Sequence, residues 1–260
     1  MSEELLIERT PPVLTVTINR GKANAIDAAL SRELGSVFAD FRDDPAFRVA
    51  ILTGAGDRFF SAGWDLKSAA EGEDYESDFG EGGFGGFAEL ENLFKPVICA
   101  VNGSAVGGGF EMVLAAHLVV AAEHAEFFLP EAVRGIVPDA GSLHLPRLLS
   151  RTQAMELLLT GRRLTAPQAL AWGLVNQVVP GPEVVDAARS LAEQVVAAAP
   201  LAVAAVLEIV EKSAGMTVRD GYALLRSGAI KNYEDALVSD DAREGPTAFV
   251  EKRLPRWQGR

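Results

Sequence analysis

Apolar residues follow two different periods along the chain, and their alternation predicts its secondary structure. Four short apolar runs bounded by turn residues predict buried strands, at residues 13–18, 49–53, 96–101 and 118–122. Between the first two runs, apolar side chains recur at helical spacing from Leu30 to Phe41, and Asp27 stands before them as a helix N-cap. Strands and helices alternate through about residue 180, which is typical of an α/β fold. The ββα rhythm suggests the turns of a spiral, although no repeat of fixed length is visible.

One segment interrupts this rhythm. Residues 71–92 are rich in glycine and acidic residues, with Phe79, Phe84 and Phe87 interleaved. This composition is typical of a mobile loop with aromatic anchors, and it favours a lid over a core element.

The end of the chain follows a different pattern, because the apolar spacing is helical only from Pro182 onward. We therefore expect two domains. An α/β core over residues 1–197 would carry the functional site, and residues 198–260 would form a helical C-terminal region. That region would serve oligomerisation and cover the active site, or its helices would fold back on their own domain.

Composition and charge exclude some classes of partner. The 260 residues are 48% hydrophobic and 23% charged, which is the composition of a globular protein with ample core. The net charge of −12 argues against nucleic acid or an anionic membrane as a partner, although a few local cations could still bind a phosphorylated ligand. The N-terminus lacks the apolar stretch of a signal peptide, and no uncharged run reaches transmembrane length. We expect a soluble cytoplasmic protein.

Cysteine and histidine give no sign of a disulfide or a metal site. Cys99 is the single cysteine of the sequence and lies within an apolar run, so we expect it to be packing in a reducing compartment. His117, His124 and His144 are scattered, and the spacing of the first two fits no zinc site. We therefore predict no bound metal.

The sequence AVGGGFEM, from Ala105 to Met112, places three glycines before an apolar helix. A phosphate-binding loop would need Gly-Lys-Ser/Thr, and none follows Gly109. The dinucleotide fingerprint would need a third glycine where Met112 stands. What remains is a row of free backbone N–H groups at a helix N-terminus, which favours negative charge. If that charge is a thioester oxygen becoming an enolate, the loop is an oxyanion hole, in which one donor is worth about 3–4 kcal/mol.

Two glutamates are candidates for proton transfer. Glu111 lies on the first turn of the predicted helix, where the dipole favours the ionised carboxylate of a base. Glu131 follows an apolar run, where desolvation favours the protonated form. Taken singly, each is better explained as an acid at the start of a helix or turn. Together, two carboxyl groups in contrasting surroundings make an acid and a base, and at close range they titrate as a pair.

Several motifs, in order and spacing, resemble the enoyl-CoA hydratase/isomerase (crotonase) family. They are Phe60–Leu66, Ala100–Gly103, Gly107–Glu111, Pro130–Glu131, Gly135–Pro138, Leu159–Thr165 and Trp172–Asn176. The resemblance covers nearly the whole chain. It implies a crotonase-like spiral with a C-terminal helical region, and a homotrimer or a hexamer built as a dimer of trimers.

The resemblance also implies a mechanism. The backbone N–H groups of Trp64 and Gly108 would form the oxyanion hole, and Glu111 and Glu131 match the two family acids. Members that only isomerise, hydrolyse or dehalogenate commonly lack one acid, so reversible hydration of a 2-enoyl-CoA is favoured. Glu111 would take a proton from water as it attacks Cβ, and Glu131 would deliver one to Cα. No cofactor is implied, because coenzyme A is part of the substrate.

The family also implies where the substrate lies. Coenzyme A would contact seven residues on two loops: Lys22, Ala23, Ala25, Ala62, Asp65, Leu66 and Lys67. Lys22 and Lys67 would be the cations nearest its phosphates, with the basic C-terminal tail of a neighbouring subunit as a helper. For Lys67, a plain surface charge is an equal alternative. The acyl pocket would include Phe84, Phe87, Pro138 and Gly141.

Within the family, three segments are most similar to members that interconvert carnitinyl-CoA and crotonobetainyl-CoA, namely Lys22–Asp27, Phe60–Lys67 and Glu244–Pro246. A trimethylammonium group requires aromatic faces or a nearby carboxylate. The candidates are Trp64, Phe84 and Phe87 for the faces, and Asp78 or Glu81 for the charge. Ser142 replaces a common family glycine, which leaves the preferred chain length open.

Two other functions stay open as alternatives. A general short-chain enoyl-CoA hydratase or an enoyl-CoA isomerase would keep the fold and change the substrate or the outcome. RNA binding, which some family members show through a lysine-rich helix, is disfavoured. The predicted helix over 27–43 carries only Arg32 and Arg42 as cations among several acids.

Overall fold

The computed structural model describes residues 3–260, which divide into two compact units. The first unit comprises the chain to Glu91 together with Val97–Ala192, and the second comprises Asn92–Pro96 and Glu193–Arg260. The sequence-based boundary was placed at 197/198, a few residues beyond this division.

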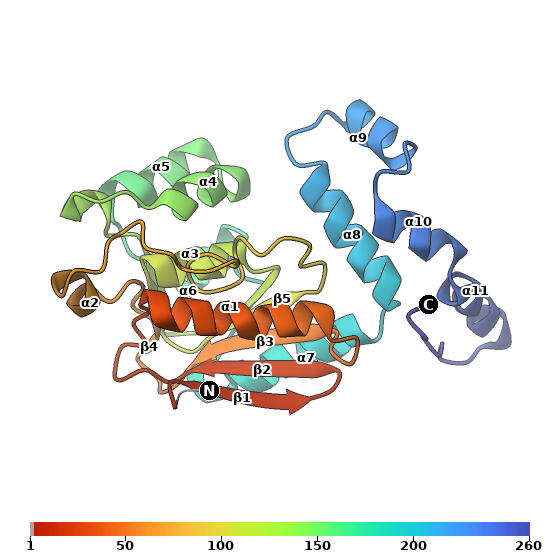
Figure 1. The fold of residues 1–260 in the computed structure, drawn as a ribbon, viewed down its shortest axis with the longest axis horizontal. Coiled ribbons are helices and arrows are strands. Elements are labelled where there is room, and N and C mark those ends of the chain that lie inside the picture. Colours follow the sequence, from red (N-terminus) through yellow and green to blue (C-terminus); the bar gives the residue numbers. More distant parts are fainter. Residues whose placement is uncertain (1–2) are drawn as a thin grey trace. The chain divides into compact units, whose positions relative to one another are not determined.

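The first unit contains two sheets (Figure 1). The larger has the strand order β1-β2-β3-β5-β7-β10, with β1 Leu5–Thr10, β2 Val13–Ile18, β3 Val49–Gly54, β5 Val97–Val101, β7 Leu118–Ala122 and β10 Gln177–Val179. The smaller has the order β4-β6-β8-β9, with β4 Phe59–Ser61, β6 Ser104–Val106, β8 Glu126–Phe128 and β9 Leu164–Thr165. The β1–β2 and β8–β9 pairs are antiparallel, and the other strand pairs are parallel.

The chain passes repeatedly from the large sheet to the small one. Strands β3, β5 and β7 are neighbours in the large sheet, and their successors β4, β6 and β8 are neighbours in the small sheet. Parallel neighbours require a crossover, and helices supply it. The helices of this unit are α1 Ala28–Asp43, α2 Leu66–Ala70, α3 Gly108–Ala115, α4 Asp139–Leu148, α5 Arg151–Thr160, α6 Ala166–Ala171 and α7 Val184–Val196, with 3₁₀ turns η1 Ala132–Arg134 and η2 Gly181–Glu183. The residues of α7 from Glu193 onward belong to the second unit. The predicted spiral of ββα units is confirmed.

Local sequence explains the first helix. The Asp27 carboxylate accepts a hydrogen bond from the Leu30 N–H at 2.8 Å, which makes it the N-cap. Leu34, Phe38 and Phe41 are fully buried on one face. The core lies between such helices and the sheet, where every residue of β3 and β5 is buried, as expected for parallel strands covered on both faces.

The acidic segment over residues 71–92 forms turns, and its two ends differ. Phe87 is buried and packs on Phe38 of α1 with ring centroids 5.0 Å apart, and Leu90 is also buried. The prediction of a lid is therefore wrong for this end of the segment, because its apolar side chains belong to the core. The residues of the segment that line a cavity, described below, lie between Tyr75 and Phe84, together with Glu89.

The second unit is helical: α8 Pro200–Lys212, α9 Val218–Leu225, α10 Lys231–Val238 and α11 Asp240–Glu251. Glu208 of α8 is buried, and its carboxylate accepts hydrogen bonds from the Lys231 and Asn232 N–H groups at 3.3 and 2.7 Å. This carboxylate therefore joins α8 to the start of α10. Large apolar side chains stay exposed in this unit, among them Val210, Val218, Phe249, Val250 and Leu254.

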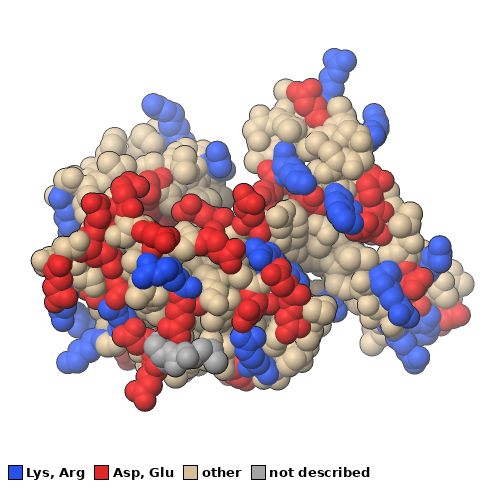
Figure 2. Space-filling view, in the orientation of Figure 1, with Lys and Arg blue, Asp and Glu red and all other residues tan. Residues whose placement is uncertain are grey.

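The acidic surface of the described residues agrees with the net charge of −12. Figure 2 shows acidic side chains outnumbering basic ones on the visible face of the first unit. Within residues 3–260, no single helix is long and apolar enough to span a membrane. The bent pair Gly181–Val196 and Pro200–Lys212 passes the same test by length and composition.

Candidate active site

Glycines between β6 and α3 allow other parts of the chain to touch their backbone. Gly107 has φ +56° and ψ −130°, a conformation open to glycine and strained for other residues. A Cβ atom at Gly107 would lie 2.5 Å from Glu131 Oε1, and one at Gly108 would overlap the Phe84 ring. The absence of side chains here lets a carboxyl group and an aromatic ring lie directly against the start of α3.

The loop after β4 packs against the same backbone. Gly63 has φ +79°, and a Cβ atom there would lie 2.6 Å from the Val106 carbonyl oxygen and 2.8 Å from the Gly108 nitrogen. A Cβ atom at Gly109 would overlap the Ser61 carbonyl oxygen. The peptide groups that follow Gly63 and precede Gly108 are therefore neighbours, although 44 positions separate these residues in the numbering.

Two backbone N–H groups are left without acceptors at this junction. The Ile26 N–H donates to the Gly63 carbonyl at 2.9 Å, and the Ile26 carbonyl accepts from the Asp65 N–H at 2.8 Å. Trp64 stands between Gly63 and Asp65, and its own N–H takes no part in this pairing with Ile26. Within residues 3–260 neither the Trp64 nor the Gly108 N–H has an acceptor. Gly108 opens α3, where the helix itself offers no acceptor. Two adjacent free donors are the arrangement that an oxyanion hole requires.

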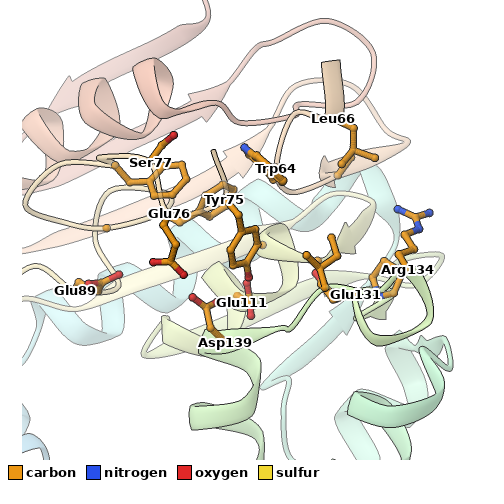
Figure 3. Close-up of a pocket in the computed structure, with 18 of the residues that line it drawn as sticks. Trp64, Leu66, Tyr75, Glu76, Ser77, Glu89, Glu111, Glu131, Arg134 and Asp139 are labelled. Atoms are coloured by element: carbon orange, nitrogen blue, oxygen red, sulfur yellow. The ribbon is translucent and has the colours of Figure 1, made fainter. Parts of the chain in front are cut away.

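Both donors border a cavity of about 340 Å³ (Figure 3). Its other lining residues come from the loop after β4 and the start of α2, from the acidic loop, from the start of α3, and from the segment between β8 and the first residue of α4. They are Ala62, Leu66, Tyr75, Glu76, Ser77, Asp78, Phe79, Gly80, Gly83, Phe84, Glu89, Gly107, Glu111, Pro130, Glu131, Arg134, Ile136 and Asp139. Within residues 3–260, no group of three or more His, Cys, Asp or Glu side chains is placed to hold a metal ion.

Glu111 reaches the cavity from the first turn of α3 and is held by one hydrogen bond. Its Oε1 accepts from the Gly141 N–H at 2.7 Å. Burial raises the pKa of Glu111 to about 7; the Gly141 hydrogen bond opposes this, and the negative charges of Asp139 and Glu131 add to it. The direction of this shift is opposite to the one expected from the helix dipole alone. Loss of hydration outweighs a dipole that acts from the end of a helix of eight residues.

Glu131 reaches the same cavity from the turn before η1. Its side chain is only 8% exposed, and its Oε2 has no hydrogen-bond partner. Burial raises the pKa of Glu131, in the direction expected from its sequence, against the opposing charge of Arg134. An unpartnered carboxyl oxygen that is nine-tenths buried is costly, and this cost is typical of a group that meets a ligand.

Comparisons with known proteins show the family of this chain. The family model for enoyl-CoA hydratase/isomerase matches residues 8–260. The chain belongs to the enoyl-CoA hydratase/isomerase family. It is 57% identical, over the whole of both chains, to a carnitinyl-CoA dehydratase of Citrobacter koseri. Among solved structures, an enoyl-CoA hydratase from Mycobacterium tuberculosis is 42% identical with a TM-score of 0.90, and a carnitinyl-CoA hydratase from Mycobacterium avium is 41% identical with a TM-score of 0.77. Both cover 100% of this chain and of their own.

The segments expected to hold coenzyme A in this family member lie close together. The Ala62 N–H donates to the Ala23 carbonyl at 2.9 Å, so the two loops are joined. Ala62 and Leu66 also line the cavity. Lys22 and Lys67 are exposed, and neither forms an ion pair with a described residue. They stay candidates for the phosphates.

Arg20 organises these loops from behind, which sequence reasoning missed. Its guanidinium pairs with Asp27, lies 3.3 Å from an Asp65 carboxylate oxygen, and donates to the Ala25 carbonyl at 3.1 Å. The Asp65 carboxylate also accepts from the Lys67 N–H at 2.9 Å and so caps α2. Asp65, proposed as a contact for coenzyme A, is thus engaged within the chain through its side chain.

The residues expected in the acyl pocket separate into two groups. Phe84 lines the cavity, and its ring meets that of Phe79 edge-on at 5.5 Å. Phe87 was a wrong choice, because it lies in the core against α1. Pro138 and Gly141 are buried and lie outside the lining, at the start of α4, where Gly141 holds Glu111.

Two residues of the acidic loop contribute contacts that the sequence did not reveal. Glu73 accepts from the Trp64 indole N–H at 2.7 Å and from the Ala28 N–H, the first of α1, at 3.1 Å. The Tyr75 ring stacks edge-on against Trp64 at 5.6 Å, and its hydroxyl donates to the Val137 carbonyl at 2.5 Å. Burial raises the pKa of Tyr75, so it stays a neutral hydroxyl. Neither residue belongs to a recognisable motif, and only their contacts identify them.

Proposed function

We propose that this family member is a hydro-lyase that interconverts carnitinyl-CoA and crotonobetainyl-CoA. One observation carries the chemistry: the carboxyl groups of Glu111 and Glu131 border the same cavity as the unpartnered N–H groups of Trp64 and Gly108. An acid–base pair and two donors for a developing enolate are the groups that addition of water to a 2-enoyl thioester needs.

In dehydration, ionised Glu131 removes the α-proton, and the electron pair moves onto the thioester oxygen held by the two N–H groups. The enolate then expels the hydroxyl group from Cβ, and protonated Glu111 donates the proton that turns it into water. Hydration reverses each step, so that Glu111 takes a proton from water and Glu131 returns one to Cα. The pair thus needs one shared proton. Burial raises the pKa of both groups, that of Glu111 to about 7, which favours such a state near neutral pH.

The choice of a cationic acyl group is supported by the relatives and by the charge of the cavity. Relatives of this chain are named carnitinyl-CoA dehydratase. Besides the two catalytic candidates, four acidic residues line the cavity, namely Glu76, Asp78, Glu89 and Asp139, against Arg134 as the one basic residue of the lining. A negatively charged cavity suits a trimethylammonium group better than the apolar end of crotonyl-CoA.

The substrate is tested by comparing kcat/KM for crotonobetainyl-CoA and crotonyl-CoA hydration. We expect a clear preference for the cationic substrate. Equal values would replace the proposal with a general short-chain enoyl-CoA hydratase, and double-bond migration without water addition would replace it with an isomerase. The mechanism is tested by Glu111→Gln and Glu131→Gln, each of which should abolish hydration while coenzyme A binding, followed by calorimetry, is nearly intact. Near-normal turnover by either variant would contradict the two-acid mechanism.

Coenzyme A is proposed to contact the joined loops over residues 22–25 and 62–67, with Lys22 and Lys67 near its phosphates and with no further cofactor. We also propose a homotrimer or a dimer of trimers in the cytoplasm. Support for assembly comes from apolar side chains of the helical unit that no described part of this chain covers, such as Phe249, 84% exposed, and Leu254, 87% exposed. Sedimentation at the mass of a monomer would contradict the assembly.

A further inference from the structure

Asp139 is an acidic residue of the cavity to which no described residue offers a counter-ion. It opens α4, and its Oδ1 accepts only a local hydrogen bond, from the Ala140 N–H at 2.8 Å. Among residues 3–260 it forms no ion pair, whereas Glu81, also acidic and exposed, lies 4.0 Å from Arg42. Arg134, the one basic residue of the lining, acts on Glu131.

Asp139 is also electrostatically linked to the groups that would do the chemistry. Figure 3 shows it next to Glu111 and beneath the Tyr75 ring. After burial, which is the larger cause, the charge of Asp139 raises the pKa of Glu111, of Glu131 and of Tyr75. Carboxylates this close repel one another, and a positive charge placed among them would relieve the repulsion. The unpartnered Glu131 Oε2 in the same cavity is independent evidence that a ligand completes the site.

The geometry of the proposed substrate indicates where such a positive charge would lie. In carnitinyl-CoA the hydroxyl group is on Cβ, and the quaternary nitrogen is attached to the neighbouring carbon. When the hydroxyl group is at Glu111, the nitrogen is therefore only two bonds from Cβ and next to the carboxylate beside Glu111. A trimethylammonium group has no N–H to donate, so it is bound by charge and by aromatic faces. The Phe84 ring against Gly108, together with Phe79, offers such faces.

We infer that Asp139 is the specificity-determining residue that recognises the quaternary ammonium group of the acyl chain, with Phe84 as the aromatic face. The inference rests on the proposed function. It differs from the sequence-based choice of Asp78 or Glu81. Glu81 lies outside the lining and next to Arg42. Asp78 lines the cavity, but Asp139 is the carboxylate that lies beside Glu111 and raises its pKa (Figure 3).

The test separates charge from shape with two substrates. Crotonobetainyl-CoA is compared with 5,5-dimethylhex-2-enoyl-CoA, in which a carbon atom replaces the quaternary nitrogen and the size of the group is kept. The measured quantity is the ratio of kcat/KM for the cationic substrate to kcat/KM for the neutral one. For Asp139→Asn we expect this ratio to fall at least tenfold, through a higher KM for the cationic substrate. Turnover of the neutral substrate shows that the variant is folded.

Two further variants complete the design. Glu81→Gln, which changes an acid outside the cavity, should keep the wild-type ratio. Asp78→Asn should lower it less than Asp139→Asn does. A wild-type ratio in Asp139→Asn, or a larger fall in Asp78→Asn, would overturn the assignment of Asp139. The proposed function fails separately, if the wild-type enzyme does not prefer crotonobetainyl-CoA to crotonyl-CoA.

Discussion

The floor and the roof of the cavity are built in different ways. The floor is the segment Gly107–Glu111 at the start of α3. Its three glycines lie so close to other segments of the same chain that a methyl group on any of them would not fit. The roof is the acidic loop over residues 73–84, held by a few polar contacts such as that of Tyr75 with Val137. The floor presents the backbone and carboxyl groups that would act on the part common to all substrates of the reaction. The roof presents side chains that can be replaced without changing the backbone. Packed backbone would thus position the groups that do the chemistry, and side chains outside it, such as Phe84 of the roof and Asp139 at the start of α4, would decide the choice of substrate.

The largest expected effect comes from a methyl group in the floor. In Gly109→Ala the new Cβ overlaps the Ser61 carbonyl oxygen, a backbone atom that cannot move aside, so the two N–H donors separate. We expect kcat to fall by about 100-fold or more, because small misplacements at a reacting centre have effects of that size. Gly35→Ala in α1 is the matched control, because the nearest atoms to its Cβ are 3.9 Å away. Comparable kinetics for the two variants would show that close packing of the floor is not needed.

The next effect concerns the free energy of unfolding, which the buried carboxyl group of Glu111 lowers. The pKa of Glu111 is about 7 in the folded protein against an ordinary value of 4.5, so the folded state binds the proton more tightly than the unfolded state. Stability therefore falls as pH rises through this range, and the loss is complete above the folded pKa. Glu111→Gln, which keeps an acceptor for Gly141, should raise the free energy of unfolding at pH 8 by up to roughly 3 kcal/mol.

Urea denaturation at pH 8 and at pH 5 checks this prediction, because the gain should largely vanish at the lower pH. Glu71→Gln, on an exposed side chain outside the cavity, should show no such difference. An equal gain for Glu111→Gln at both pH values would mean that the buried charge is not its cause.

The smallest expected effect lies in the roof. Glu73 joins the loop to the Trp64 indole and to the start of α1. Glu73→Gln keeps the shape but has one acceptor oxygen in place of two, so one of the two hydrogen bonds is lost and the other is no longer charge-assisted. We expect kcat/KM to fall by about tenfold at most. Steady-state kinetics measure it, with Glu71→Gln again as the control. A loss as large as that of Gly109→Ala would remove the distinction between floor and roof.

Errors in the sequence-based predictions fall where distant segments meet. Phe84 and Phe87 stand in the same glycine-rich stretch, yet one ring enters the cavity and the other packs on Phe38. Periodicity could not separate them, because a loop has no repeating face. The place of Glu111 on a helix predicted that its carboxyl group binds a proton weakly. Burial by other segments raises its pKa instead. Glu73 and Asp139 carry no local signal at all.

By itself the sequence determined four strands of the large sheet, the amphipathic first helix and the glycines before α3, and it singled out Glu111 and Glu131 as candidates. These depend on short-range constraints, namely side-chain period, capping and the space that a backbone needs. Only the tertiary structure decided how strongly the two acids hold their protons, which aromatic rings face the substrate, and which carboxylate is left without a partner. Those properties depend on distance and exclusion of water between segments far apart in the chain, and no single stretch of sequence encodes either.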